Sequence, residues 1–477
     1  MASKKTLNAK NLEALGAERL AELLIEISRG NAVAQRRLRL ELAGAASPAD
    51  MVQEIRKRLT AFARSRSFVN WQQRKALVVD LETQKQAIAQ VATVDAAEAL
   101  DPLWRFRALA HPIFGRCDDS SGNVIAVFQA ACRDLGDTAN LANAAPNVLA
   151  EQAYRALIEN EYGQYDGLIE VLAPALGPTG LDHLKQLILK LSQESRQKPR
   201  AEERKVVGWG MVGPLYADEL AERHRSSMVR MALEAIADAQ GDVDAFIAQQ
   251  GEKPRRVPSV AVEIAQRLLA AGRTEEAWSA INAVDQDRPG WIPVEWEQTR
   301  IKVLEALGRA DEVQAFRWAC FERSLNPEHL RSYLKRLPDF DDLEAEERAI
   351  AHARSHPSVH QALSFLMTWP ALDQAAHLAL TRVDELNGDF YEILAPAAAA
   401  LEAKYPLAAT VLRRALIDFA LERNRTQRYQ HAARHLEECE NLADQIEDFD
   451  RFEAHNVYVR RLKTQHGRKS SFWSLVV

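Results

Sequence analysis

The feature that most constrains this chain is the helical spacing of its apolar residues. Apolar side chains recur three and four residues apart along nearly all of its 477 residues. No stretch shows a convincing alternation of β-branched residues, and no Asn-Gly or Asp-Gly pair joins two such stretches. The composition also favours Ala, Leu, Arg and Glu, which are good helix formers. The sequence therefore predicts an all-α fold.

A repeating pattern of helix, glycine and acidic residue follows in the second half of the chain. The three glycines, Gly241, Gly272 and Gly308, are 31 and 36 residues apart, which brackets the roughly 34-residue period of tetratricopeptide (TPR) repeats. Glycine supplies a left-handed turn between two antiparallel helices, and an acid is favourable at the next N-terminus. Because one helix pair cannot bury its apolar face alone, we expect the pairs to stack as a TPR-like α-solenoid.

Changes in composition indicate how the chain is divided. Residues 196–208 belong to its most charged, helix-poor stretch, which predicts a linker. Residues 209–477 then carry the TPR-like helical repeats. Before the linker, helix caps and apolar stripes occur without a period. They predict an N-terminal helical hairpin over residues 1–45 and an irregular helical module over residues 46–195.

The overall composition argues against several classes of protein. A net charge of −6 is small for this length and does not favour a dedicated nucleic-acid-binding protein. The four cysteines lie far apart, without C-x-C or C-x-x-C spacing, which excludes the common zinc arrangements and fits a reducing compartment. The sequence has no run of about 18 apolar residues and no apolar leader segment. We therefore expect a cytoplasmic protein with no membrane partner.

Four segments carry a resemblance to a known family. They are Cys117–Gly122, Glu161–Asp166, Leu269–Ala277 and Arg428–Leu436. With the helical pattern around them, they resemble a family of uncharacterised bacterial helical-repeat proteins that is loosely associated with SWIM-type zinc-finger proteins. The resemblance implies a TPR-like fold over most of the chain and implies no activity. The SWIM signature itself, C-x-C followed by C-x-H, is absent from the sequence.

The basic segment at residues 56–75 is the first candidate for binding. Arg56, Lys57 and Arg64 precede the aromatic Trp71. Basic side chains interleaved with aromatic ones could grip a phosphate backbone and stack on bases. The helical wheel favours a solvated helix face instead, because Lys57 and Arg64 point outward together but Arg58 lies about 100° away from Lys57. A nucleic-acid-associated protein is therefore the alternative function.

Two polar loops in the N-terminal half form the second candidate. Asp118 and Asp119 precede a glycine, and clustered carboxylates of this kind can hold Ca²⁺ or Mg²⁺. The EF-hand spacing fails, however, so a loop followed by a helix cap is favoured. Tyr165 and Asp166 form the other loop, and the sequence does not show whether the two loops meet. A metal-dependent enzyme around Asp118 and Asp119 is thus a further alternative.

Aromatic residues crowd the repeat segment. They are Trp278, Trp291, Trp296, Phe316, Trp318 and Phe321. Exposed tryptophans in a groove would be binding hot spots, whereas packing between helices is favoured for most of these rings. Trp291 and Trp296 are the candidate interaction residues, and Trp291, in a loop bounded by prolines, is the one we expect to be exposed.

The motifs of the common enzyme classes are missing. We find no Walker A loop, no G-x-G-x-x-G after a strand and no G-x-S-x-G elbow. A chain almost without strands also lacks the usual α/β frames for an active site. We therefore predict a non-enzymatic interaction or scaffold protein that binds an unknown protein or peptide, with no catalytic, cofactor-binding or metal-ligating residues.

Overall fold

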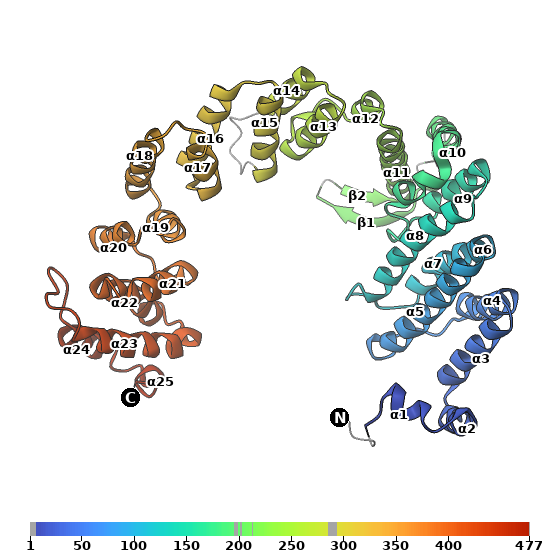
Figure 1. The fold of residues 1–477 in the computed structure, drawn as a ribbon, viewed down its shortest axis with the longest axis horizontal. Coiled ribbons are helices and arrows are strands. Elements are labelled where there is room, and N and C mark those ends of the chain that lie inside the picture. The colour runs from blue at the N-terminus through green and yellow to red at the C-terminus, as the bar shows by residue number, and fades with distance from the viewer. Residues whose placement is uncertain (1–5, 195–198, 201–202, 212, 285–292, 477) are drawn as a thin grey trace. The chain divides into compact units, whose positions relative to one another are not determined.

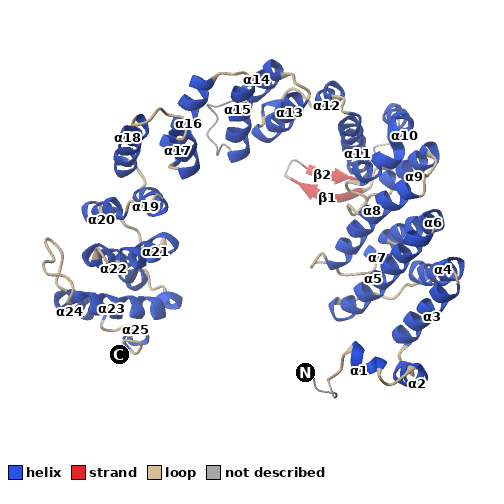
Figure 2. Cartoon of the chain, in the orientation of Figure 1, coloured by secondary structure: helices blue, strands red, loops and turns tan. Residues whose placement is uncertain are grey.

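The computed structural model describes residues 6–194, 199–200, 203–211, 213–284 and 293–476. Within these residues, helices form nearly all of the regular structure, and the strands form one short hairpin (Figures 1 and 2). The prediction of an all-α fold is therefore confirmed. The chain separates into two compact units, residues 1–254 and residues 255–477.

The first unit is a series of helices that pack on their neighbours in the sequence. α4 packs on α5 and α6, α8 on α10, and α10 on α11. One apolar cluster runs through them from Leu40 to Ile236. The helices are α1 (Ala9–Glu13), α2 (Ala17–Ser28), α3 (Ala32–Ala46), α4 (Pro48–Arg64), α5 (Trp71–Val94), α6 (Ala96–Ala108), α7 (Ala110–Phe114), α8 (Asn123–Leu141), α9 (Pro146–Ile158), α10 (Leu168–Gln193), α11 (Ala217–Gln240) and α12 (Val243–Gln249).

Local sequence signals explain where several of these helices begin and bend. The Ser47 side chain accepts the backbone N–H of Asp50 and caps α4, whose first residue is a proline. Asn70 and Gln73 form a reciprocal capping box at the start of α5. α10 is kinked at Gly177, which has a φ of 55° that a residue with a side chain rarely adopts. These local signals set the starts of α4 and α5 and the bend in α10.

A β-hairpin follows the stretch predicted to be a linker. Strands β1 (Val206–Gly210) and β2 (Gly213–Tyr216) pair antiparallel, with Trp209 opposite Pro214. The predicted linker, residues 196–208, lies between α10 and α11, and its residues 196–198 and 201–202 are outside the described part of the chain. Since α10 and α11 pack directly on each other, this stretch lies within the first unit, and the compact units divide at residue 254.

The second unit continues the neighbour-to-neighbour pattern. α13 packs on α14 and α15, α16 on α17 and α18, and α20 on α22. Its longer elements are α13 (Pro258–Ala270), α14 (Thr274–Asn282), α15 (Val294–Ala306), α16 (Ala310–Ser324), α17 (Pro327–Leu334), α18 (Asp341–Ser355), α19 (Val359–Thr368), α20 (Leu372–Thr381), α21 (Tyr391–Leu401), α22 (Pro406–Glu422), α23 (Tyr429–Ala443) and α24 (His455–His466). The short ones are η2 (Pro254–Arg256), η3 (Val383–Glu385), η4 (Thr426–Arg428) and α25 (Ser470–Trp473).

The glycines of the repeat pattern adopt the predicted conformation. Gly241 has a φ of 68°, Gly272 of 73° and Gly308 of 71°. Each ends one helix of a pair in the left-handed region, where a Cβ would be strained. The turns between α11 and α12, α13 and α14, and α15 and α16 therefore follow from the sequence.

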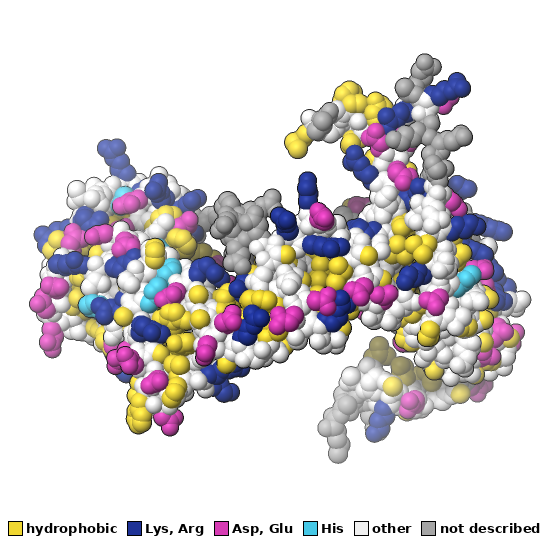
Figure 3. All heavy atoms as spheres, turned by 90° about the horizontal axis from the view of Figure 1, so that it is seen from above, with side chains coloured by type: hydrophobic (Ala, Val, Ile, Leu, Met, Phe, Trp, Pro, Cys, Tyr) yellow, Lys and Arg dark blue, Asp and Glu magenta, His cyan; other side chains and the backbone are white. Residues whose placement is uncertain are grey.

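The surface carries mixed charge. On the face shown in Figure 3, lysine and arginine side chains are interspersed with acids, in keeping with the small net charge of −6. Among the residues that the structure describes, no helix is long and apolar enough to cross a membrane.

Candidate ligand-binding cavity

Part of the predicted basic segment is engaged in ion pairs. An Arg56 guanidinium nitrogen lies 2.8 Å from a carboxylate oxygen of Asp101, and the Lys57 ammonium lies 2.7 Å from Glu54. Arg64, in the last turn of α4, and Trp71, at the start of α5, are exposed. Two of the three predicted cations therefore have a carboxylate partner in an exposed ion pair.

The Asp118–Asp119 loop is the cap of α8. The Asp119 carboxylate accepts the backbone N–H groups of Val124 and Ile125, at 3.0 and 2.8 Å. The Asp118 carboxylate accepts the N–H of Ser120, and this bond lowers its pKa. Both carboxylates thus accept hydrogen bonds from nearby backbone N–H groups.

The second polar loop is held separately. Tyr165 is buried with its ring 4.4 Å from the Arg107 guanidinium, and burial raises its pKa to about 12. The Asp166 carboxylate accepts the Asn160 side chain at 2.8 Å. Within the described residues, no hydrogen bond or ion pair joins Tyr165 or Asp166 to the acids that cap α8.

Trp296 belongs to the core rather than to an interaction surface. Only 2% of it is exposed, and its indole N–H donates to the Ile281 carbonyl at 3.1 Å. Trp291 lies outside the described residues. The described tryptophans that do face solvent are Trp71 and Trp209.

A polar cavity of about 630 Å³ in the second unit is the strongest candidate for a binding site. One face of α22 forms its floor, through Val411, Arg414, Ala415, Asp418, Phe419 and Glu422. The segment from η3 to residue 388 forms one wall. The connection between α23 and α24, with the first turns of α24, forms the other.

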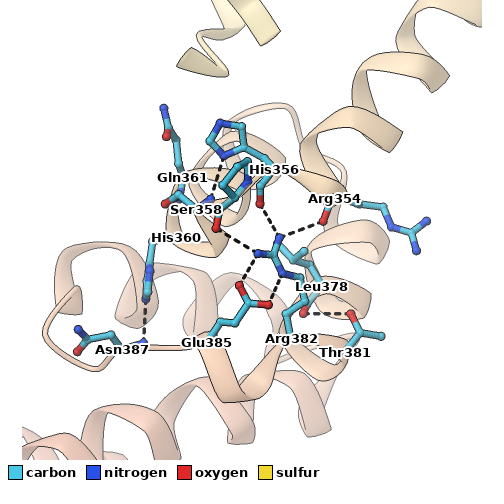
Figure 4. Close-up of polar contacts among 11 residues, drawn as sticks. Arg354, His356, Ser358, His360, Gln361, Leu378, Thr381, Arg382, Glu385 and Asn387 are labelled. Carbon is cyan, nitrogen blue, oxygen red and sulfur yellow. Dashed lines mark hydrogen bonds and ion pairs between the residues drawn. The ribbon is translucent and has the colours of Figure 1, made fainter. Parts of the chain in front are cut away.

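A network centred on Arg382 fixes the first wall (Figure 4). The Arg382 guanidinium is paired with Glu385 and donates to the backbone carbonyls of Arg354 and His356, at 3.1 and 2.8 Å. It therefore ties the end of α20 and η3 to the turn between α18 and α19. His360 completes the attachment, since its Nε2 accepts the Asn387 N–H at 2.9 Å.

Gly388 brings the same wall against α22. A Cβ at this position would lie 2.3 Å from the Ala415 carbonyl oxygen and 2.5 Å from the Cβ of Phe419. Both neighbours belong to the helix that forms the floor, so only glycine allows the wall to approach this closely. The Arg428 guanidinium holds the turn from the other side, through an ion pair of 2.9 Å with Asp389.

Arg414 lies in the floor with hydrogen-bond donors that have no acceptor. The residue is 7% exposed, and its Nη1 donates to the Glu453 carbonyl at 2.7 Å. Its Nε and Nη2 are buried without a partner. The guanidinium stacks on the Tyr458 ring, 4.4 Å from its centroid, and burial lowers the pKa of Arg414.

The carboxylates beside Arg414 are bonded to other groups. Asp418 accepts the Tyr458 hydroxyl at 3.0 Å and an Arg461 nitrogen at 3.1 Å. Glu453 accepts the Nε of Arg461 at 2.9 Å. Arg461 thus donates hydrogen bonds to both acids. Burial and the nearby Asp418 carboxylate raise the pKa of Tyr458 well above its usual value. The charge of Arg414 is left without a directly bonded anion.

The mouth of the cavity carries both signs of charge. Arg423 and Arg451 line it, and so do the exposed acids Asp384 and Glu422. The lining therefore contains four arginines and four acids in all: Arg414, Arg423, Arg451, Arg461, Asp384, Asp418, Glu422 and Glu453. A ligand that fits this lining carries an anionic group for the floor and tolerates acids at the rim.

A second polar cluster, away from the cavity, contains side chains that could hold a metal ion. Glu297, Cys320 and His329 are all buried. Burial and the nearby Glu297 charge raise the pKa of the Cys320 thiol to about 11. Burial opposes ionisation of Glu297, but hydrogen bonds from His329 and Arg323 outweigh it and lower the pKa of this carboxyl.

Neither polar cluster was found from the sequence alone. The available signal for the cavity was the row Arg414, Asp418 and Glu422, which places charges at helical spacing on α22 between apolar neighbours. The residues of the other walls come from loops more than 20 positions away. Their approach depends on tertiary contacts that no local pattern encodes.

Fold and cavity define an all-α helical-repeat protein with a polar cavity in its second unit. The chain belongs to the family of unknown function DUF6880, whose sequence profile matches residues 2–475. This confirms the resemblance to an uncharacterised family over nearly the whole chain, while a link to SWIM-type zinc fingers is not part of that match.

No curated protein matches the chain in sequence. A solved structure described as a circular tandem repeat protein with novel repeat topology and enhanced subunit contact surfaces is similar at 13% identity, covering 96% of this chain and 95% of that one. Its TM-score of 0.16 is too low for the likeness to bear on fold or function.

Proposed function

We propose that this chain is a non-enzymatic helical scaffold that binds a peptide segment of a partner protein, with an acidic side chain of that segment in the Arg414 cavity. The observation that carries the proposal is the buried Arg414 guanidinium, which has two donors without acceptors in the floor of a 630 Å³ cavity. A carboxylate is the natural acceptor for such a fork of N–H donors.

The charges at the rim favour a peptide of mixed charge over a polyanion. Asp384 and Glu422 would repel the continuous phosphates of a nucleic acid, whereas a lysine or arginine beside the bound acid would pair with them. The ion pairs of Arg56 and Lys57 also favour a peptide over a nucleic acid, because both cations of the alternative nucleic-acid surface already contact a carboxylate. A link between the family and SWIM-type zinc-finger proteins stays a prediction.

The test is binding of the full chain to arrays of short peptides in four charge classes: acidic, basic, mixed and neutral. We expect retention of mixed-charge and acidic peptides, and its loss in Arg414→Met. Arg460→Met is the matched control, because Arg460 is an exposed arginine of α24 that does not line the cavity. Labelled single- and double-stranded oligonucleotides serve as the competing ligands.

Two outcomes would overturn the proposal. In one, peptides bind equally whatever their charge or with the same affinity to Arg414→Met. In the other, oligonucleotides bind more tightly than any peptide class, and the binding falls steeply with salt and depends on Arg56 and Lys57.

A further inference from the structure

Three helices of the second unit bring a carboxylate, a thiol and an imidazole together in the core. Glu297 lies on α15, Cys320 on α16 and His329 on α17. One ligand atom from each lies within 4.8 Å of the other two, and all three residues are buried. No other group of three such side chains occurs in the part of the chain that the structure describes.

The backbone around these residues explains the convergence. α16 ends at Ser324, and the residue that caps it, Leu325, adopts a left-handed conformation with a φ of 49°. Asn326 then caps α17 through the N–H of Glu328, and Pro327 is the first residue of that helix. This sharp turn places His329 opposite Glu297, with 3.0 Å between Nε2 and the carboxylate oxygen. Helices rather than loops therefore hold all three ligands.

The donor set has the chemistry of a zinc site. Zn²⁺ binds thiolate sulfur at about 2.3 Å and imidazole nitrogen or carboxylate oxygen at about 2.0–2.2 Å, commonly with three protein ligands and one water. We propose that Glu297, Cys320 and His329 form a zinc site. Tetrahedral coordination at those bond lengths separates ligand atoms by roughly 3.5 Å, so side-chain movements of about 1 Å close the site.

Arg323 is the cation that a metal ion would replace. Its guanidinium bonds to the Glu297 carboxylate, and one nitrogen lies 3.8 Å from the Cys320 sulfur. Half of the Arg323 side chain is exposed, so the guanidinium can turn into solvent without disturbing the core. Zn²⁺ and the arginine are thus alternative counter-ions for the same two groups, and each weakens binding of the other.

This competition separates a metal site from a purely structural ion-pair network. If the cluster serves only to neutralise a buried Glu297, then Arg323→Met removes a stabilising partner and no metal takes its place. If the cluster binds zinc, the same substitution removes the competitor and tightens zinc binding. For Arg323→Met, an ion-pair network therefore predicts no zinc binding, whereas a zinc site predicts tighter zinc binding than in the unchanged chain.

The experiment titrates the metal-free full chain with Zn²⁺ against a competing chelator, and with Co²⁺ as a spectroscopic probe. We expect one equivalent of metal and a sulfur-to-cobalt charge-transfer absorption. Cys320→Ser should abolish that absorption and weaken zinc binding by more than the 10- to 100-fold typical of an outer-shell change. Cys117→Ser, which changes a thiol of the first unit, should leave both unchanged.

Three results would overturn the proposal: no stoichiometric binding, a charge-transfer band that survives in Cys320→Ser, or weaker zinc binding in Arg323→Met. Far-UV circular dichroism of each variant checks that the helices are retained. If Cys320→Ser fails to fold, His329→Gln and Arg323→Met still test the site through opposite changes in zinc affinity.

Discussion

Arg413 and Arg414 are consecutive residues of α22, and their side chains lie in opposite surroundings. Arg413 is 3% exposed and bonds two carboxylates, Glu438 at 2.8 Å and Glu402 at 2.5 Å. Burial works against its charge, but these bonds outweigh burial and raise its pKa. Arg414 is almost as buried and bonds no carboxylate, and burial lowers its pKa.

Two buried arginines on one helix can thus differ in whether their charge is compensated within the protein. A guanidinium between two carboxylates has little left to offer a ligand, and its removal exposes the charges it compensated. A guanidinium that donates to one carbonyl and stacks on a tyrosine keeps its capacity for an anion. On the face of α22 toward α21 and α23, the Arg413 charge is therefore compensated by two carboxylates, although its Nη1 also lacks an acceptor. On the face toward the cavity, the Arg414 charge has no bonded anion.

The largest effect should come from Gly388→Ala, which tests whether backbone contact rather than charge builds the cavity face. Since the new Cβ would meet the Ala415 carbonyl and Phe419, we expect a loss of about 3 kcal/mol in the free energy of unfolding. Urea denaturation followed by circular dichroism measures it. Gly208→Ala, whose Cβ has no neighbour closer than 3.8 Å, should cost far less; an equal loss would show that the close approach is unimportant.

Arg413→Met should have the next largest effect. It leaves Glu402 and Glu438 without their shared cation, although both acids are at least one-third exposed and partly solvated. We therefore expect a loss of about 2 kcal/mol, below the 3–5 kcal/mol of a fully buried pair. Urea denaturation beside Arg434→Met, which removes an exposed 3.7 Å ion pair with the same Glu438, measures the difference. Equal stabilities of the two variants would contradict a structural role for Arg413.

A smaller effect concerns the pH dependence of the Arg413 cluster. Burial lowers the pKa of His435 from its ordinary value of 6.5, despite its hydrogen bond to Glu438. The folded protein therefore keeps this imidazole neutral where the unfolded chain would protonate it. Stability is full above about pH 6.5 and falls as the pH drops below that value. His435→Gln should flatten this slope in thermal unfolding, while His431→Gln, at an exposed position of the same helix, should preserve it.

The smallest effect on stability should be that of Arg414→Met. An apolar side chain of similar length replaces a buried, incompletely bonded guanidinium, so the free energy of unfolding should change by less than about 1 kcal/mol. Peptide binding in the cavity should nevertheless be lost. If Arg414→Met destabilises the chain as much as Arg413→Met does, the two faces of α22 are alike and the cavity is only a structural feature.

Most of the fold could be predicted because its signals are local. Caps such as Ser47 and turns such as Gly272 act within a few residues, and apolar stripes mark the buried face of each helix. The hairpin after residue 205 was missed because its strands are short and glycine-rich. The sequence favoured a boundary at residues 196–208, which stand out by charge, over a smaller one at residues 251–258. The compact units divide at residue 254, a position that depends on which helices pack together.

The candidate sites could not be predicted for the same reason. Arg414, Gly388 and Glu453 are separated in the sequence and meet only through the packing of α22. The spacing of Glu297, Cys320 and His329 matches no metal motif, since each ligand comes from a different helix. The sequence did predict a loop followed by a helix cap next to Asp118 and Asp119, because caps are local, but it did not identify Asp119 as the residue whose carboxylate accepts the helix N–H groups.

The neighbour-to-neighbour packing of the helices has a consequence for synthesis on the ribosome. Each helix contacts mainly the one or two before and after it, so a newly emerged helix finds its partner already made. Few contacts join residues that are far apart in the sequence, so the contact order is low, which favours rapid folding. The first unit can therefore fold while the second is still being translated, and a stalled or truncated chain would expose the apolar faces of its last helices rather than those of the whole unit.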